Sequence, residues 1–161
     1  MGIVQIGFVW PHNFLGEVID FAEGKGSQPS HVFVVMPPLI EDYILEAIAE
    51  GVVFRPVKKY AGVKVRIVPV EVPYPELFYA ACFLMEGDKY SIAGCAQAVI
   101  HDLTDISIPL GSGSAQFCSE VAARALRCGG LYDLHPGHPA KVVEPYQLLI
   151  ELDKTKGDAC D

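Results

Sequence analysis

The residue with the clearest chemical potential is Cys118, which lies in the segment Gln116-Phe-Cys-Ser-Glu120. A glycine- and serine-rich stretch over 111–114 leads into it, and the residues after it have helical spacing. A thiol at the first turn of a helix lies near unpaired backbone N–H groups and the positive end of the helix dipole, which favour the thiolate. Free cysteine titrates at roughly 8.5, so a modest downward shift makes it nucleophilic near neutral pH. The simpler interpretation is a buried small hydrophobic residue, the usual environment of a free cysteine.

Thiol chemistry also needs a proton acceptor, and His31 is the strongest candidate because imidazole titrates near neutral pH. It opens an apolar run in which His31, Phe33 and Val35 share one side of an expected strand. Glu46 lies inside another apolar run, where a carboxylate costs desolvation energy unless it is paired. An imidazole on a neighbouring strand would offset that cost and be oriented in return. The alternative for both residues is an ordinary packed or solvent-facing side chain.

The other histidines are weaker candidates for catalysis. His101 falls on an expected helix, and His12 lies near a loop. His135 and His138 lie in a proline- and glycine-rich loop, which together with the nearby Cys128 forms the alternative site, a metal cluster. The prolines favour a rigid turn instead, and closed zinc sites normally draw on four dedicated ligands. We therefore expect no metal and no other cofactor.

Composition limits the classes of protein to which the chain can belong. Its 161 residues, 51% hydrophobic and 20% charged, predict one globular domain over 1–161. The net charge of −8 disfavours nucleic acid and anionic surfaces as partners. Five cysteines without a Cys-x-x-Cys pair indicate reduced thiols rather than a disulfide framework. The apolar runs are too short to span a membrane, and the first residues lack the features of a secretory signal. We therefore expect a cytoplasmic location. The sequence makes no prediction of the oligomeric state.

The first half of the chain predicts a sheet. Apolar, β-branched runs predict strands at 3–9, 30–36, 42–47, 52–57 and 64–70. Short links between the later runs, including a turn at Glu50-Gly51, favour antiparallel hairpins. The longer connection after the first strand carries an amphipathic pattern that predicts a helix over 13–22.

The second half of the chain changes to helical periodicity. Helices are predicted at 75–85, 91–103 and 117–128, and 144–152 predicts a short helix or strand. The last residues, about 153–161, are expected to form a flexible tail. Strands followed by helices, without an internal repeat or linker, predict an α+β domain.

Taken in order along the chain, several segments resemble the circularly permuted papain-like cysteine hydrolases related to NlpC, of the YiiX type. The matching segments are Gly2-Ile-Val, the amphipathic segment 13–22, Ser30-His31-Val32, Leu45-Glu46-Ala47, Gly51-Val52, Gly87-Asp-Lys-Tyr90, Phe117-Cys118-Ser119-Glu120 and Glu144-Pro145-Tyr-Gln-Leu148. Each motif is short, and their shared order over nearly the whole chain carries the specificity. The resemblance implies an antiparallel sheet or partial barrel packed on helices. Its strands would precede the nucleophile helix, with the cleft between sheet and helix.

The resemblance also implies roles for three residues: Cys118 as nucleophile, His31 as general base and Glu46 as the group that orients His31. It implies a cysteine peptidase or amidase that works through an acyl-enzyme on a small peptide, amide or acyl substrate, with peptidoglycan-type peptides as the first candidates. A lipid acyltransferase or thioesterase on the same fold is the alternative enzyme. A non-catalytic binding domain is the alternative of a different class. Gln116 is close to the thiol in sequence, but no side-chain oxyanion donor is assigned.

Overall fold

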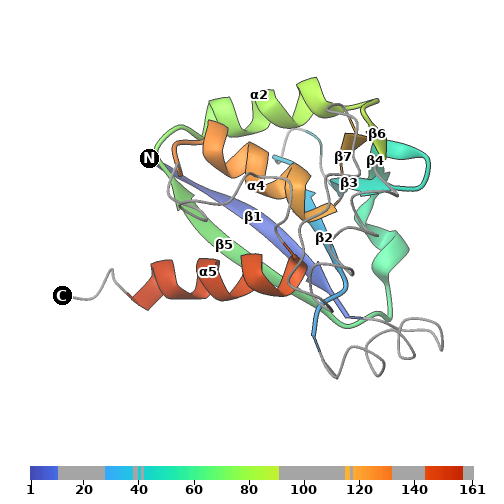
Figure 1. The fold of residues 1–161 in the computed structure, drawn as a ribbon, viewed down its shortest axis with the longest axis horizontal. Coiled ribbons are helices and arrows are strands. Elements are labelled where there is room, and N and C mark those ends of the chain that lie inside the picture. Colours follow the sequence, from blue (N-terminus) through green and yellow to red (C-terminus); the bar gives the residue numbers. More distant parts are fainter. Residues whose placement is uncertain are drawn as a thin grey trace, which may run out of the picture.

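In the computed structural model, the protein has an α+β fold built on one five-stranded antiparallel sheet (Figure 1). The structure describes residues 1–10, 28–37, 40, 42–90, 115–116, 118–131 and 144–157. The strands of the large sheet are β1 (Gly2–Val9), β2 (His31–Val35), β3 (Tyr43–Ile48), β4 (Gly51–Pro56) and β5 (Val65–Val72). The helices are η2 (Val57–Tyr60, a 3-10 helix), α2 (Pro75–Met85), α4 (Cys118–Cys128) and α5 (Pro145–Gly157). Two short strands, β6 (Lys89–Tyr90) and β7 (Ala115–Gln116), pair in parallel.

The large sheet has the strand order β4-β3-β2-β1-β5, and every neighbouring pair is antiparallel. β1 occupies an inner position and pairs along its whole length with β5, from Gly2↔Val72 to Val9↔Val65. The pairing of β2 with β3 is shorter, because it begins only at Phe33↔Glu46. The first residues of β2 therefore extend beyond the last β3 partner, and the two strands separate there.

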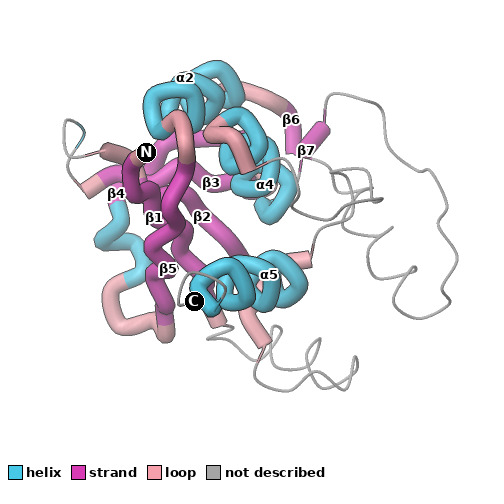
Figure 2. Tube along the Cα trace, turned by 90° about the vertical axis from the view of Figure 1, so that its left-hand side faces the viewer, coloured by secondary structure: helices cyan, strands magenta, loops and turns pink. Residues whose placement is uncertain are grey.

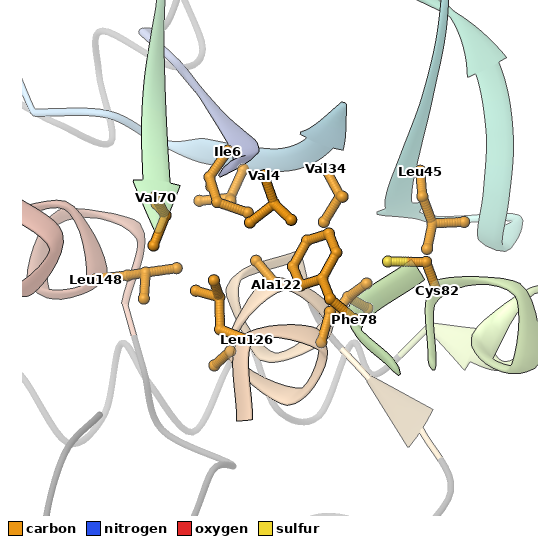
Figure 3. Close-up of a cluster of buried hydrophobic side chains, with 14 of the residues drawn as sticks. Val4, Ile6, Val34, Leu45, Val70, Phe78, Cys82, Ala122, Leu126 and Leu148 are labelled. Carbon is orange, nitrogen blue, oxygen red and sulfur yellow. The ribbon is translucent and has the colours of Figure 1, made fainter. Parts of the chain in front are cut away.

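One face of the sheet carries the main hydrophobic core and is covered by α2, α4 and α5 (Figure 1). Alternation along the strands sends every second side chain to this face, and the most deeply buried come from β1, β2, β3 and β5. Phe78, Cys82, Ala122, Leu126 and Leu148 fill the space from the helix side (Figure 3). The apolar stripe of each helix thus docks on the apolar face of the sheet, as expected for a two-layer domain.

The opposite face of the sheet is covered differently. A second, smaller cluster forms there around Val9, Phe33 and Ile44, with Val57 and Tyr60 of η2 packed against it. Figure 2 shows the short helix on the side of the sheet that faces away from α4 and α5. The two faces of one sheet therefore carry a large apolar core and a small mixed layer.

The strands and helices predicted in the described part of the chain are confirmed, with shifts of one or two residues at their ends. The segment 144–152 is a helix, and α5 continues beyond it to Gly157, so the first residues of the expected tail are helical. Leu148, Leu149 and Leu152 anchor α5 in the core, and Asp153 accepts a hydrogen bond from Arg66 Nη2 at 2.6 Å, which ties the next turn to β5. The helices predicted at 13–22 and 91–103, and the end of the chain at 158–161, lie outside the described residues.

None of the described helices is both long enough and apolar enough to cross a bilayer.

Candidate active site

Cys118 is the first residue of α4, and its side chain is only 8% exposed. The predicted inward orientation of this thiol is therefore correct. Its sulfur accepts hydrogen bonds from two backbone N–H groups, those of Val32 and Ser119. Ser119 belongs to the first turn of the helix, where N–H groups have no intrahelical partner. The donor from Val32 comes from the neighbouring strand and needs a separate explanation.

The separation of β2 and β3 makes the Val32 N–H available to the thiol. Met36 donates its backbone N–H to Tyr43 O of β3 at 3.0 Å, so the even-numbered residues of β2 direct their N–H groups toward β3. Val32 has the same orientation, but it lies beyond the last pair of those strands, Phe33↔Glu46. The N–H group that would have continued the ladder binds the Cys118 sulfur instead. The start of α4 thus takes the place that β3 leaves open.

His31 lies at the start of β2 and contacts both other members of the predicted triad. Its Nε2 is 2.9 Å from Glu46 Oε2, and a side-chain hydrogen bond joins the imidazole to Cys118. Because Nε2 is used by the carboxylate, Nδ1 is the ring nitrogen left for the thiol. The imidazole is 21% exposed, whereas the Glu46 side chain is completely buried. The three residues predicted from the sequence therefore form one hydrogen-bonded line of sulfur, imidazole and carboxylate.

The electrostatics of this line favour the charged pair of thiolate and imidazolium. Burial by itself would raise the pKa of Cys118, but the positive charge and hydrogen bond of His31, with the two backbone donors, lower it below its ordinary value. Burial would lower the pKa of His31, but the Cys118 thiolate and the Glu46 carboxylate raise it to about 9. Each charge thus stabilises the other, which favours the thiolate and imidazolium over the neutral pair.

Glu46 is held by more partners than the sequence indicated. Lys59 Nζ donates to Oε1 at 2.5 Å, and the hydroxyl of Tyr60 donates to Oε2 at 2.6 Å. Burial would raise the pKa of this carboxyl, but the hydrogen bonds from His31, Lys59 and Tyr60 lower it to about 2. The carboxylate therefore stays ionised and fixes the orientation of the imidazole. Sequence reasoning missed Lys59 and Tyr60, because they lie in a short 3-10 helix whose docking depends on the tertiary structure.

The position of Tyr60 depends on the close packing of the Phe33 ring against Gly7 of β1. The Phe33 ring stacks on the Tyr60 ring with 5.1 Å between centroids and 12° between planes. The Phe33 ring itself lies over Gly7, where an added Cβ would be 2.2 Å from the ring atoms. A side chain at position 7 would displace the Phe33 ring. Glycine therefore allows Phe33 to pack on the sheet and Tyr60 to stack on Phe33.

The remaining candidates are not part of this cluster as far as the structure describes them. Cys128 ends α4 with an exposed thiol. Its proposed metal partners His135 and His138 lie outside the described residues, as do His12 and His101. Within the described ranges, no group of three or more histidine, cysteine, aspartate or glutamate side chains is placed to hold a metal ion.

Comparisons with protein-family models and with curated proteins identify no relative of this chain. No protein-family model matches the chain. No curated protein matches it significantly. The functional argument therefore rests on the geometry of the site itself.

Proposed function

We propose that the protein is a cysteine-dependent hydrolase that cleaves an amide or ester through an acyl-enzyme. Cys118 is the nucleophile, His31 the general acid and base, and Glu46 the residue that orients His31. The observation that carries the proposal is the hydrogen-bonded line from the Cys118 sulfur through the imidazole to Glu46, with the pKa of the thiol lowered. A nucleophile, its base and an orienting group in mutual contact are the elements that acyl transfer needs.

In the acylation step, the Cys118 thiolate attacks the substrate carbonyl carbon, a C–S bond forms and the carbonyl oxygen becomes an oxyanion. The imidazolium of His31 then gives its proton to the leaving amine or alkoxide as that bond breaks, which leaves a thioester and a neutral imidazole. In the second step, His31 takes a proton from water while the oxygen attacks the thioester. The thiolate departs, the acid is released and the ion pair is restored.

The backbone around Cys118 supports stabilisation of the oxyanion. Ser119 at the start of α4 and Val32 of β2 direct N–H groups toward the sulfur, and the positive end of the helix dipole lies at the same place. Donors fixed before the reaction stabilise developing negative charge without reorganising, and removing one of them from an enzyme typically costs about 10²–10³-fold in rate. The side chain of Gln116 lies outside the described residues and is given no role.

We infer a circularly permuted papain-like arrangement of the YiiX type, because strands precede the nucleophile helix here. Small peptide, amide or acyl compounds, including peptidoglycan-type peptides, are the proposed substrates, and a cytoplasmic setting would keep the thiol reduced. Transfer of a lipid acyl group and cleavage of a thioester use the same covalent intermediate. They are therefore distinguished by assay with matched amide, thioester and lipid donors.

The first test compares the alkylation of two cysteines by iodoacetamide across pH, with the adducts mapped by mass spectrometry. Cys128 is exposed and serves as the internal reference. We expect the reaction of Cys118 to begin well below the pH at which Cys128 reacts. A Cys118 that labels no earlier than Cys128 would contradict an activated nucleophile and favour a binding domain.

The second test is turnover by Cys118→Ala, with Cys128→Ala as the matched control. We expect Cys118→Ala to abolish hydrolysis of amide and ester substrates while the melting temperature stays close to that of the wild type. Cys128→Ala should retain full activity because its thiol lies at the other end of α4. Retained activity in Cys118→Ala would remove the nucleophile assignment.

A further inference from the structure

A hollow of about 430 Å³ lies between the β3–β4 hairpin and η2, next to Lys59, which donates to Glu46. Its walls come from Ile48 and Glu50 at the turn between these strands, from Arg55 and Pro56, and from Lys58 and Lys59 of η2. This volume falls within the usual range for small-molecule pockets, about 300–1,000 Å³. Nothing in the proposed mechanism uses the hollow.

The position of the hollow relates it to the catalytic imidazole in two ways. Ile48 follows Glu46 by two residues in β3, so both side chains lie on the same face of the sheet. Continued from Phe33↔Glu46, the register of β2 and β3 places Ile48 across from His31, where the two strands have separated. Lys59 lines the hollow and also donates to Glu46, whose other oxygen contacts His31. The hollow therefore borders the part of the catalytic line formed by His31 and Glu46.

The charge of the hollow is opposite to that of the chain. Three of its six lining residues are cationic and one is anionic, although the whole protein carries a net charge of −8. Arg55 and Glu50 form an ion pair at 3.2 Å, and Lys59 is paired with Glu46 at 2.5 Å. The side chain of Lys58 forms no hydrogen bond or ion pair with the described residues. Its ammonium group therefore remains available to an anion that enters the hollow.

We propose that this hollow binds an anionic group of the substrate, so that the hydrolase selects acyl compounds or peptides with a carboxylate or phosphate close to the scissile bond. This inference rests on the proposed function and deepens it. Lys58 provides the charge for this anion, because Lys59 and Arg55 are already paired with Glu46 and Glu50. An ammonium group binds carboxylate and phosphate alike as a compact point charge. A cationic side chain at the site repels a cationic substrate group, so the site also selects against cationic substrates although the whole protein is acidic.

Binding is tested without turnover by following backbone amide resonances of Ile48 and Lys58 during titration. The probes are monomethyl glutarate, its neutral dimethyl ester and inorganic phosphate. We expect saturable shifts with the two anions and none with the diester, and the stronger anion identifies the preferred group. Lys58→Met should weaken anion binding about fivefold, the effect of one solvated charge pair. Lys154→Met removes the same charge from the exposed face of α5 and should change nothing. Absent shifts, or shifts unaltered in Lys58→Met, would overturn the anion site.

Selectivity is tested with two nitrophenyl esters of glutaric acid, one with a free carboxylate and one with that carboxylate methylated. We expect wild-type kcat/KM to favour the carboxylate, and Lys58→Met to reduce this preference about fivefold while leaving the neutral ester unaffected. Hydrolysis of both esters without preference would refute the assignment of substrate class while the hydrolase proposal stands. If Cys118 hydrolyses neither ester, the hydrolase proposal fails for this class, and the anion site is judged by the titration alone.

Discussion

The two faces of the central sheet differ in what they bury. The face under α2, α4 and α5 buries almost only apolar side chains, among them Phe8, Phe78 and Leu126. The opposite face buries a carboxylate, Glu46, and surrounds it with an imidazole, an ammonium group and a phenol. An apolar layer gains free energy from the area it removes from water, whereas a buried charge is tolerated only when it is fully hydrogen-bonded.

Because of this difference, one face of the sheet mainly stabilises the fold, and the other face mainly sets the charge of the residues in the candidate site. The apolar face fixes the position of α4, and therefore of Cys118, largely independently of pH. The opposite face sets the charge and orientation of His31 through Glu46, and its contribution depends on protonation. The thiol lies where the two layers meet, at the point where β2 and β3 separate. Variants on the two faces should consequently have distinguishable effects on stability and on reactivity.

Among variants that keep the Cys118 thiol, the largest expected effect on reactivity comes from His31→Ala. Removing the imidazole takes away both the proton donor and the charge that lowers the pKa of Cys118. We expect acylation to slow by about 10²–10⁴-fold, the range for loss of a general acid–base catalyst. The onset of Cys118 alkylation should move to higher pH at the same time, and added imidazole should restore part of the rate. A mild effect on both measurements would point to another base, with His12 as the first alternative.

The largest expected effect on stability comes from Phe78→Ala on the helix-covered face. Phe78 is fully buried between sheet and helices, so its truncation leaves a cavity and should cost about 3–5 kcal/mol of unfolding free energy. Urea unfolding measures this cost, and Leu77→Ala, which truncates a half-exposed neighbour on α2, should cost far less. The pH profile of Cys118 alkylation should stay unchanged wherever the Phe78→Ala variant is folded. A shifted profile would show that the two faces are not independent.

The Glu46→Gln substitution should change how stability depends on pH. The pKa of Glu46 is lowered from 4.5 to about 2 in the folded protein, so its charge stabilises the fold above pH 4.5. This stabilisation, about 3 kcal/mol, is lost as the pH falls through about 2. Between these pH values, the stability of wild type should fall more steeply than that of Glu46→Gln, as measured by urea unfolding at each pH. Parallel curves would mean that the Glu46 carboxylate is not held as described.

The smallest expected effect comes from Tyr60→Phe, which removes one hydrogen bond from Glu46 and keeps the ring stacked on Phe33. We expect a loss of about 2 kcal/mol at pH 7, typical of a hydrogen bond to a charged group. Tyr43→Phe is the matched control, because it deletes the hydroxyl of a tyrosine that is 40% exposed on β3. Equal stabilities of these two variants would remove Tyr60 from the network that orients Glu46.

The sequence was sufficient to predict the five strands of the large sheet and the helices α2 and α4, and it singled out the three residues that the structure brings together. The alternation around His31 and Glu46 and the helical spacing after Cys118 are local properties, and local patterns determine secondary structure and the face that each side chain occupies. The end of α5 was not predictable in this way, because Asp153 and the residues after it are polar. Its position depends on contacts from α5 to the sheet, including that of Asp153 with Arg66.

By itself, the sequence determined that a thiol, an imidazole and a carboxylate lie on a helix and two strands. Only the tertiary structure decided that β2 and β3 separate at Phe33↔Glu46 and that the start of α4 fills the gap. It also decided that Lys59 and Tyr60 reach Glu46 from a 3-10 helix on the other face. The reason is that strand register and helix docking depend on contacts between residues far apart in the chain, which no local pattern contains.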